Sequence, residues 1–151
     1  MQVNQQIAQL LTNTIRKGNL EIIAEGYSMF PFIQHGNVCR FVAFQLDELK
    51  KGDIVLFRND RQQLVAHRLV NFSTTGGVRV FLFRGDTNIA IDSPVQENQL
   101  LGKLISIKKR KYTIKTDGWA ARVWGWLILY ISPIRIFLNK YTRRRMYVER
   151  L

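Results

Sequence analysis

Short apolar runs separated by polar breaks fill the first 115 residues and predict a mainly β fold. Before them, four apolar residues recur at helical spacing, so we expect a short amphipathic helix over residues 3–17 that ends at Gly18. The later runs are rich in Val, Ile and Phe, and Gly, Asn and Asp separate them, as is typical of strands and turns. The expected strands are the front half of "LEIIAEGYSMFPFI", "VCRFVAF", Ile54–Arg58, "LVAHRLVNF", "VRVFLF" and "LLGKLISIKKRKYTI", the last as one long or two short strands.

The breaks between these runs contain no helical segment. "STTGG", residues 73–77, is expected to be a turn. Strands that follow one another in this way indicate an antiparallel, partly closed sheet.

Residues 118–142 depart from this pattern. They are apolar on all sides, contain all three tryptophans and carry no charge from Val123 to Ile134. A spanning helix needs about 20 apolar residues, whereas Arg122 and Arg135 bracket a shorter run that Pro133 interrupts. We expect one or two helices lying in a membrane interface; a helix packed on the sheet is the alternative, and a spanning helix would require both arginines to snorkel.

Charge is concentrated in the same part of the chain. Residues 1–107 hold 11 Lys/Arg and 9 Asp/Glu, whereas residues 108–151 hold 12 Lys/Arg and 2 Asp/Glu, a net charge of +10. Such a tail indicates an anionic partner, either lipid headgroups or nucleic acid. Its tryptophans favour an anionic membrane surface bound through residues 118–145, and no nucleic-acid partner is expected.

Composition excludes several classes of site. Cys39 is the one cysteine, so an intramolecular disulfide and a cysteine-based zinc site are excluded. The N-terminus has no basic region followed by an apolar run, so we expect no secretory signal. The chain has no metal-ligand cluster, nucleotide-binding glycine loop or paired-carboxylate arrangement. We therefore expect no cofactor and no metal.

Ser28, in "GYSMFPFI", is the candidate nucleophile. A serine hydroxyl needs a base within hydrogen-bond reach, and the chain has two histidines. His35 lies in a polar turn and is expected to be exposed. His67 lies within a strand, on the apolar face, where a histidine needs a polar partner and is more often structural than catalytic. The acidic candidates to orient it are Asp86, in "FRGDTN", and Asp92, in "IAIDSP", both in turn contexts.

Four segments, "GYSMFPFI", "KGDIVLF", "AHRLV" and "FRGDTN", resemble in order and spacing the boxes of the type I signal peptidase superfamily, which includes the self-cleaving LexA-type repressors. The resemblance covers roughly residues 26–104 and implies that superfamily's antiparallel β fold. "AHRLV" resembles the branch that uses histidine followed by arginine. In that branch an acidic residue six positions beyond the Gly-Asp aspartate supports the histidine. This implies Asp92 as the third member, with Asp86 as a second-shell or substitute partner.

The resemblance implies a serine endopeptidase that cleaves a leader or signal segment from a precursor. Ser28 would attack the scissile carbonyl, His67 would transfer the proton, and the Ser28 N–H would be one oxyanion donor. Gly26 would be a close-approach position before the nucleophile, and Met29 and Pro31 would set the geometry behind it. The strand before Ser28 would pair with an extended substrate.

The expected organisation is a catalytic domain over residues 1–116 followed by an aromatic, basic membrane-associating tail over residues 117–151. We expect a monotopic membrane protein with its catalytic domain on the cytoplasmic face. Two alternatives stay open. One is a non-catalytic, peptidase-like binding module, and the other is a self-cleaving protein, although the first 25 residues are too short for a separate DNA-binding domain.

Overall fold

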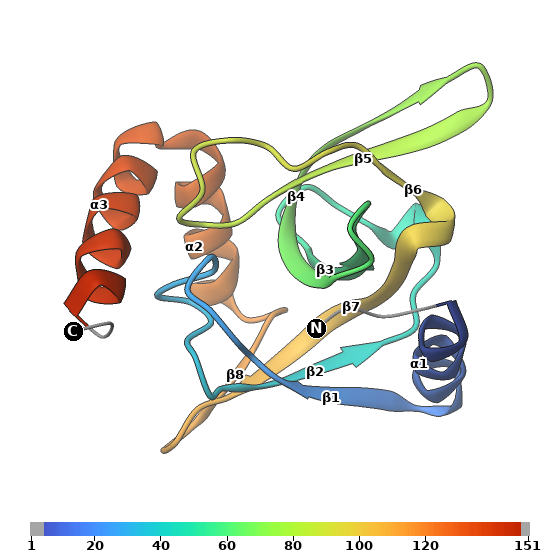
Figure 1. Cartoon of the computed structure of the whole chain (residues 1–151), viewed down its shortest axis with the longest axis horizontal. Coiled ribbons are helices and arrows are strands. Elements are labelled where there is room, and N and C mark those ends of the chain that lie inside the picture. The colour runs from blue at the N-terminus through green and yellow to red at the C-terminus, as the bar shows by residue number, and fades with distance from the viewer. Residues whose placement is uncertain (1–4, 149–151) are drawn as a thin grey trace.

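The computed structural model describes residues 5–148, which fold into one curled sheet with helices at both ends of the chain (Figure 1). Helix α1 spans Gln5–Lys17, so Val3 and Asn4 of the expected helix lie outside the described residues. The strands are β1 Asn19–Ile23, β2 Val38–Val42, β3 Ile54–Arg58, β4 Leu64–Thr75, β5 Val78–Arg84, β6 Val95–Gln96, β7 Leu100–Lys108 and β8 Thr113–Lys115. Two 3-10 turns, η1 Leu46–Glu48 and η2 Glu97–Gln99, precede β3 and β7, and helices α2 Trp119–Tyr130 and α3 Ser132–Val148 follow.

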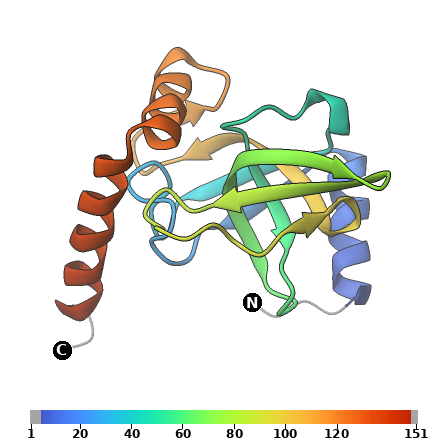
Figure 2. The same ribbon diagram turned by 90° about the horizontal axis from the view of Figure 1, so that it is seen from above.

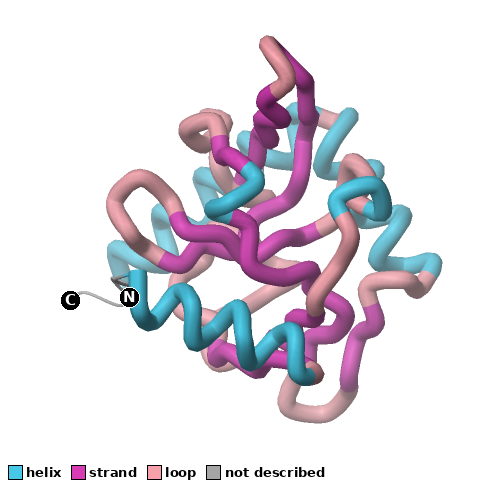
Figure 3. Tube along the Cα trace, turned by 90° about the vertical axis from the view of Figure 1, so that its right-hand side faces the viewer, coloured by secondary structure: helices cyan, strands magenta, loops and turns pink. Residues whose placement is uncertain are grey.

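The strands form an eight-stranded antiparallel sheet in the order β1-β2-β7-β3-β4-β5-β6, with β8 also paired to β7. Extra residues in β7, at Leu101 and Ile105, and in β4, at Val70, interrupt the register, and such bulges bend and twist a strand locally. The sheet therefore curls into a half-barrel, as Figure 3 shows behind α1. The predicted mainly β, partly closed antiparallel fold is confirmed.

The turn predicted at residues 73–77 is shorter than expected. Strand β4 continues to Thr75, and only Gly76 and Gly77 separate it from β5. Both glycines have positive φ, 58° and 79°, the conformation that a two-residue hairpin turn requires. The glycine pair alone therefore makes the turn, and the preceding Ser and Thr residues extend the strand.

The core lies on both faces of β3, because its side chains alternate between two apolar clusters. Ile54 and Leu56 join a helix-side cluster that contains residues of α1, α2, β2, β7 and the loop after Ser28. Val55 and Phe57 join a second cluster with residues of β4, β5 and β6, in which Phe57 stacks on Phe83. β3 is thus buried on both faces and anchors the strand β4 that carries His67.

One or two C-terminal helices were expected, and the structure has two, α2 and α3, which are bent by 95° relative to each other at Ile131 (Figure 2). Among the described residues, no single helix has the length and apolar composition to cross a bilayer, although the bent pair passes both criteria when its two helices are taken together. The inward stripe of the pair is buried and consists of Ala121, Gly125, Ile128, Leu138 and Thr142. This stripe therefore packs against the rest of the protein, as the alternative prediction of a packed helix requires.

The outward stripe of α2 is different. Trp119, Val123, Trp126 and Tyr130 follow helical spacing and are all exposed, and α3 exposes Phe137, Tyr141 and Tyr147 in the same manner. The exposed side of the helix pair, which in a soluble protein is usually polar, is thus rich in aromatic residues.

Candidate active site

Ser28 lies in the loop between β1 and β2, and contacts from the loop after β5 hold that position. Its carbonyl oxygen accepts hydrogen bonds from the Thr87 N–H at 2.9 Å and the Thr87 hydroxyl at 3.2 Å. Gly85 packs beneath the same carbonyl, where a Cβ would lie only 2.7 Å from the oxygen. Two loops that are far apart in sequence are therefore locked together at the serine.

A chain of hydrogen bonds joins Ser28, His67 and Asp92. His67 Nε2 lies 3.0 Å from Ser28 Oγ, and His67 Nδ1 lies 2.6 Å from Asp92 Oδ2. A carboxylate only accepts hydrogen bonds, so Nδ1 carries the proton and Nε2 is left to accept one from the serine hydroxyl. This is the arrangement in which a neutral histidine acts as a general base on serine.

Neighbouring elements fix the histidine. Its side chain is 9% exposed, and its ring meets the edge of the Phe57 ring. Asp92 follows β5, where its backbone N–H donates to the Phe83 carbonyl at 2.9 Å. The imidazole is therefore held by residues of β4 and by Asp92, which follows β5. The Asp92 side chain is itself 26% exposed.

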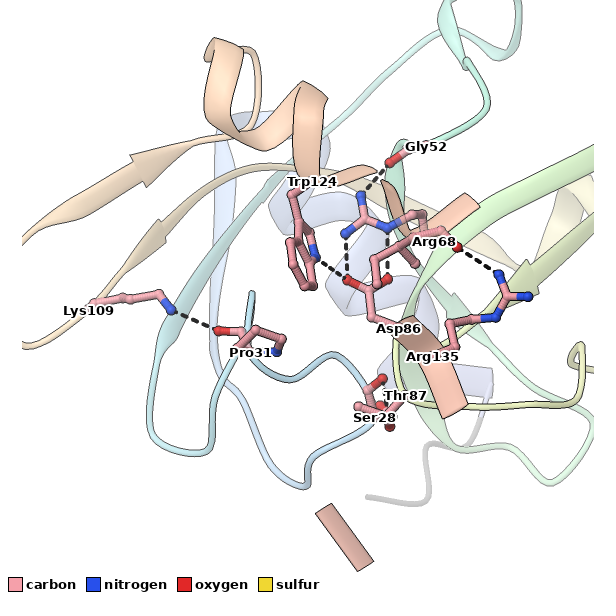
Figure 4. Close-up of polar contacts among 10 residues, drawn as sticks. Ser28, Pro31, Gly52, Arg68, Asp86, Thr87, Lys109, Trp124 and Arg135 are labelled. Carbon is pink, nitrogen blue, oxygen red and sulfur yellow. Dashed lines mark hydrogen bonds and ion pairs between the residues drawn. The ribbon is translucent and has the colours of Figure 1, made fainter. Parts of the chain in front are cut away.

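Asp86 does not take the role of substitute partner that sequence analysis gave it. Both ring nitrogens of His67 are occupied by Ser28 and Asp92. Asp86 is instead fully buried and receives two hydrogen bonds from Arg68, at 2.7 and 2.8 Å, and one from Trp124 Nε1 at 2.9 Å (Figure 4). A buried carboxylate requires such compensation, so Asp86 is a structural ion-pair partner beside the site.

Gly26 was expected to be a close-approach position before the nucleophile. It lines the cleft described below, and no described protein atom lies within 4 Å of where its Cβ would be, so a close approach by bound substrate stays a prediction. Its φ of 77° by itself favours glycine at this position. Met29 is buried in the helix-side cluster, whereas Pro31 follows a cis peptide bond and its carbonyl accepts a hydrogen bond from Lys109 Nζ at 3.1 Å.

An apolar cleft of about 300 Å³ leads to Ser28 and His67. One wall is β1 with the residues that follow it, and the other is the first part of β4. The larger apolar residues in the lining are Ile22, Ile23, Met29, Ile33, Phe41, Leu56 and Leu64. A second cleft of about 320 Å³ reaches His67 and Asp92 from another side and has a more polar lining that includes Asn59, Arg61, Gln63 and Gln99.

Both walls of the apolar cleft present strand edges. Within the described residues, β1 pairs only with β2, and residues 64–67 of β4 pair only with β3 because pairing with β5 begins at Arg68. Unpaired strand edges are templates for an added strand.

The other titratable groups near the serine loop, Lys109, Cys39 and His35, do not provide an alternative general base. Burial lowers the pKa of Lys109, but its ammonium is hydrogen-bonded to the Pro31 carbonyl. Burial raises the pKa of the Cys39 thiol to about 11. His35 is exposed, as expected. Over residues 5–148 the structure contains no group of three or more His, Cys, Asp or Glu side chains placed to hold a metal ion.

Sequence reasoning missed the residues that support the site. Arg68 is 3% exposed and uses its third donor group, NH1, on the Gly52 carbonyl at 2.9 Å. An arginine in the middle of an apolar strand was the available signal, because a buried guanidinium needs an acidic partner. Trp124 and Asn139 carried no comparable signal, since their partners are more than 35 residues away in sequence.

Comparisons with known proteins give one partial similarity. The chain is 39% identical over 54 residues to signal peptidase I W of Bacillus subtilis (strain 168). The match covers 35% of this chain and 28% of the relative, so the chain is aligned with just over a quarter of that protein. No protein-family model matches the chain. This is a distant similarity to the signal peptidase I family.

Proposed function

We propose that this protein is a serine endopeptidase that cleaves a leader or signal segment from a precursor by a Ser-His-Asp mechanism. The observation that carries the proposal is the hydrogen-bonded chain from Ser28 Oγ through His67 to Asp92, at 3.0 and 2.6 Å, at the end of an apolar cleft. The partial similarity to a signal peptidase I supports the same class of reaction.

In the proposed mechanism, Ser28 Oγ attacks the scissile carbonyl carbon while His67 Nε2 removes the hydroxyl proton. The tetrahedral intermediate collapses as the imidazolium gives that proton to the leaving amine, which leaves an acyl group on Ser28. Water, deprotonated by His67, then releases the acyl group. Asp92 holds the tautomer and stabilises the imidazolium.

The proposed oxyanion donor is the Ser28 backbone N–H. It donates to no acceptor within residues 5–148, so it is available to a substrate. Gly26 has no side chain, and the second donor is therefore a backbone group or comes from another segment.

The proposed substrate binds as an extended strand between β1 and the first part of β4. The unpaired edges on both walls support pairing of this kind, and the apolar lining supports an apolar segment with side chains of alternate residues directed into the cleft. The resemblance to signal peptidases adds a preference for small residues next to the scissile bond.

Co-expression with candidate precursors from neighbouring genes, followed by mass spectrometry, tests this function. Wild-type protein should produce a shortened precursor with one defined new N-terminus. Ser28→Ala should leave the same precursor intact while remaining folded. Cleavage that persists in Ser28→Ala, or that is absent for every precursor with wild type, would argue for the binding-module alternative.

We also propose that the outward face of α2 and α3 binds an anionic membrane surface. Six exposed aromatic residues support this, namely Trp119, Trp126, Tyr130, Phe137, Tyr141 and Tyr147, together with exposed basic residues in the same helices, Arg122, Lys140, Arg143 and Arg144. Aromatic rings favour headgroup depth, and arginine and lysine favour anionic lipid. The cytoplasmic location and the division at residue 116 stay predictions from the sequence.

Liposome co-sedimentation tests the membrane proposal. The double variant Trp126→Ser with Phe137→Ser should reduce binding to vesicles of anionic lipid. The control Leu10→Ser, at an exposed residue of α1 at the other end of the molecule (Figure 1), should not reduce it. Substitution is preferable to truncation after Thr116, because truncation would also remove the hydrogen bond from Trp124 to Asp86. Tight binding to single-stranded nucleic acid without vesicle binding would contradict the proposal.

A further inference from the structure

The C-terminal helix pair makes direct contacts with the loop that follows β5 and carries the partners of Ser28. In the first contact, Trp124 Nε1 of α2 donates to Asp86 Oδ2 at 2.9 Å. Asp86 lies between Gly85, which packs under the Ser28 carbonyl, and Thr87, which donates to that carbonyl. Figure 4 shows Trp124 and Arg68 converging on the Asp86 carboxylate, with Ser28 and Thr87 adjacent.

The second contact comes from α3. Asn139 Nδ2 donates to the Thr87 carbonyl at 2.9 Å, and the Thr87 N–H donates to the Ser28 carbonyl at the same distance. One residue, Thr87, therefore connects the helix to the serine through its own two backbone groups. Tyr141 of α3 also stacks on Phe30, two residues after Ser28, with 5.4 Å between ring centroids.

These contacts differ in how closely they reach the two members of the proposed catalytic pair. Ser28 lies in a loop whose position depends on residues 85–87, and through them on α2 and α3. Asp86 also accepts hydrogen bonds from Arg68, the residue after His67 in β4, whereas the contact from Asn139 leads through Thr87 to Ser28 alone. His67 itself is held by the pairing of β4 with β3 and by Asp92, so a shift of the helix pair would move Ser28 relative to the imidazole.

We infer that α2 and α3 are part of the active-site scaffold, with Trp124 and Asn139 as positioning residues that set the distance from Ser28 Oγ to His67 Nε2. This rests on the proposed function. The helix pair whose outward face is proposed to bind the membrane thus also positions the nucleophile, through Trp124 and Asn139, and loss of either contact lowers the rate of attack by Ser28.

A peptidyl diphenyl phosphonate that carries the alanine side chain next to phosphorus tests the inference without knowledge of the substrate. Ser28 Oγ attacks phosphorus while His67 takes the serine proton, so that an O–P bond forms and a P–O bond to one phenoxy group breaks. His67 then passes the proton to the departing phenoxide, which leaves as phenol. The dependence of labelling on probe concentration separates the maximal rate of labelling from the apparent affinity for the probe.

The informative variants are Trp124→Phe and Asn139→Ala. Each removes one side-chain donor group, and each has a control at an exposed residue of the same helix: Ala120→Ser in α2 and Ile136→Ala, at a residue that is 49% exposed, in α3. Thermal unfolding of every variant gives the folded fraction at the assay temperature.

We expect both informative variants to lower the maximal rate of labelling about tenfold or more, because a misplacement of about 1 Å can cost up to about a hundredfold in rate. The affinity for the probe should stay within about twofold, and the controls should match wild type. Unchanged rates in both variants would overturn the inference while wild-type labelling still supports the proposed function. A loss that only follows the folded fraction, or falls equally on affinity, would show a purely structural role and also overturn it. Absence of Ser28 labelling in wild type would instead contradict the proposed function.

Discussion

Gly85→Ala is the substitution that most directly challenges the packing under Ser28. The added Cβ would lie 2.7 Å from the Ser28 carbonyl oxygen, and 2.9 Å from Asn88 Nδ2. Ordinary contact begins near 3.4 Å, so the oxygen and the new carbon must separate by about 0.7 Å. The Asn88 side chain can rotate away, but the Ser28 carbonyl is backbone and is tied to Thr87 by two hydrogen bonds.

Forced overpacking of this kind costs about 1–3 kcal/mol. In a chain of 151 residues that cost corresponds to a fall in Tm of roughly 2–12 °C. The same displacement should reduce processing or phosphonate labelling by about tenfold or more, since it moves the nucleophile by a large part of an ångström.

Calorimetry and labelling of the same preparation measure both effects. Gly18→Ala is the matched control, because nothing lies within 4 Å of its Cβ position and its φ is not positive. A Gly85→Ala variant with the Tm and the labelling rate of wild type would contradict this prediction, since the two loops would then not be in the contact that the structure shows.

Three further predictions follow from the site and its surroundings. Ser28→Ala and His67→Ala should each abolish processing of a true substrate without unfolding the protein, and Asp92→Ala should cost less than either, which a comparison of cleavage rates would check. Asp86→Asn should destabilise the protein by about 3–5 kcal/mol in chemical denaturation because it leaves the buried Arg68 guanidinium without its counter-charge, whereas Asp47→Asn, at an exposed partner of Arg79, should have no measurable effect. Because burial raises the pKa of Cys39 from 9.0 to about 11, a thiolate-specific reagent at pH 8 should react at least about a hundredfold more slowly with native than with unfolded protein. For the same reason the free energy of unfolding should fall as the pH rises above about 9, and a Cys39 that reacts equally fast in both states would contradict this.

Short apolar runs separated by Gly, Asn and Asp were enough to predict the antiparallel sheet and every strand except the two-residue β6, because these features are local to each run. Where the prediction failed, a local conformational detail decided the outcome. Ser73–Thr75 look like a turn by composition, but Gly76 and Gly77 supply both positive φ values that the hairpin needs, so the strand continues to them.

The environment of Asp86 shows why the supporting network was harder to predict. Two acidic residues were candidates to orient one histidine, and spacing within the signal peptidase resemblance favoured Asp92, which is hydrogen-bonded to His67 in the structure. Nothing local indicated that Asp86 would meet Trp124, which lies 38 residues further along the chain. Long-range contacts between a loop and a terminal helix depend on how the sheet curls, and no short window of sequence records this.

The most direct measurement of the central claim is covalent trapping of the nucleophile. Wild-type protein incubated with the peptidyl phosphonate is digested, and the modified peptide is identified by mass spectrometry. We predict one adduct, on Ser28, that is absent in both Ser28→Ala and His67→Ala. An adduct on a different serine or tyrosine, or undiminished modification of Ser28 in His67→Ala, would contradict the claim that His67 activates Ser28 for attack.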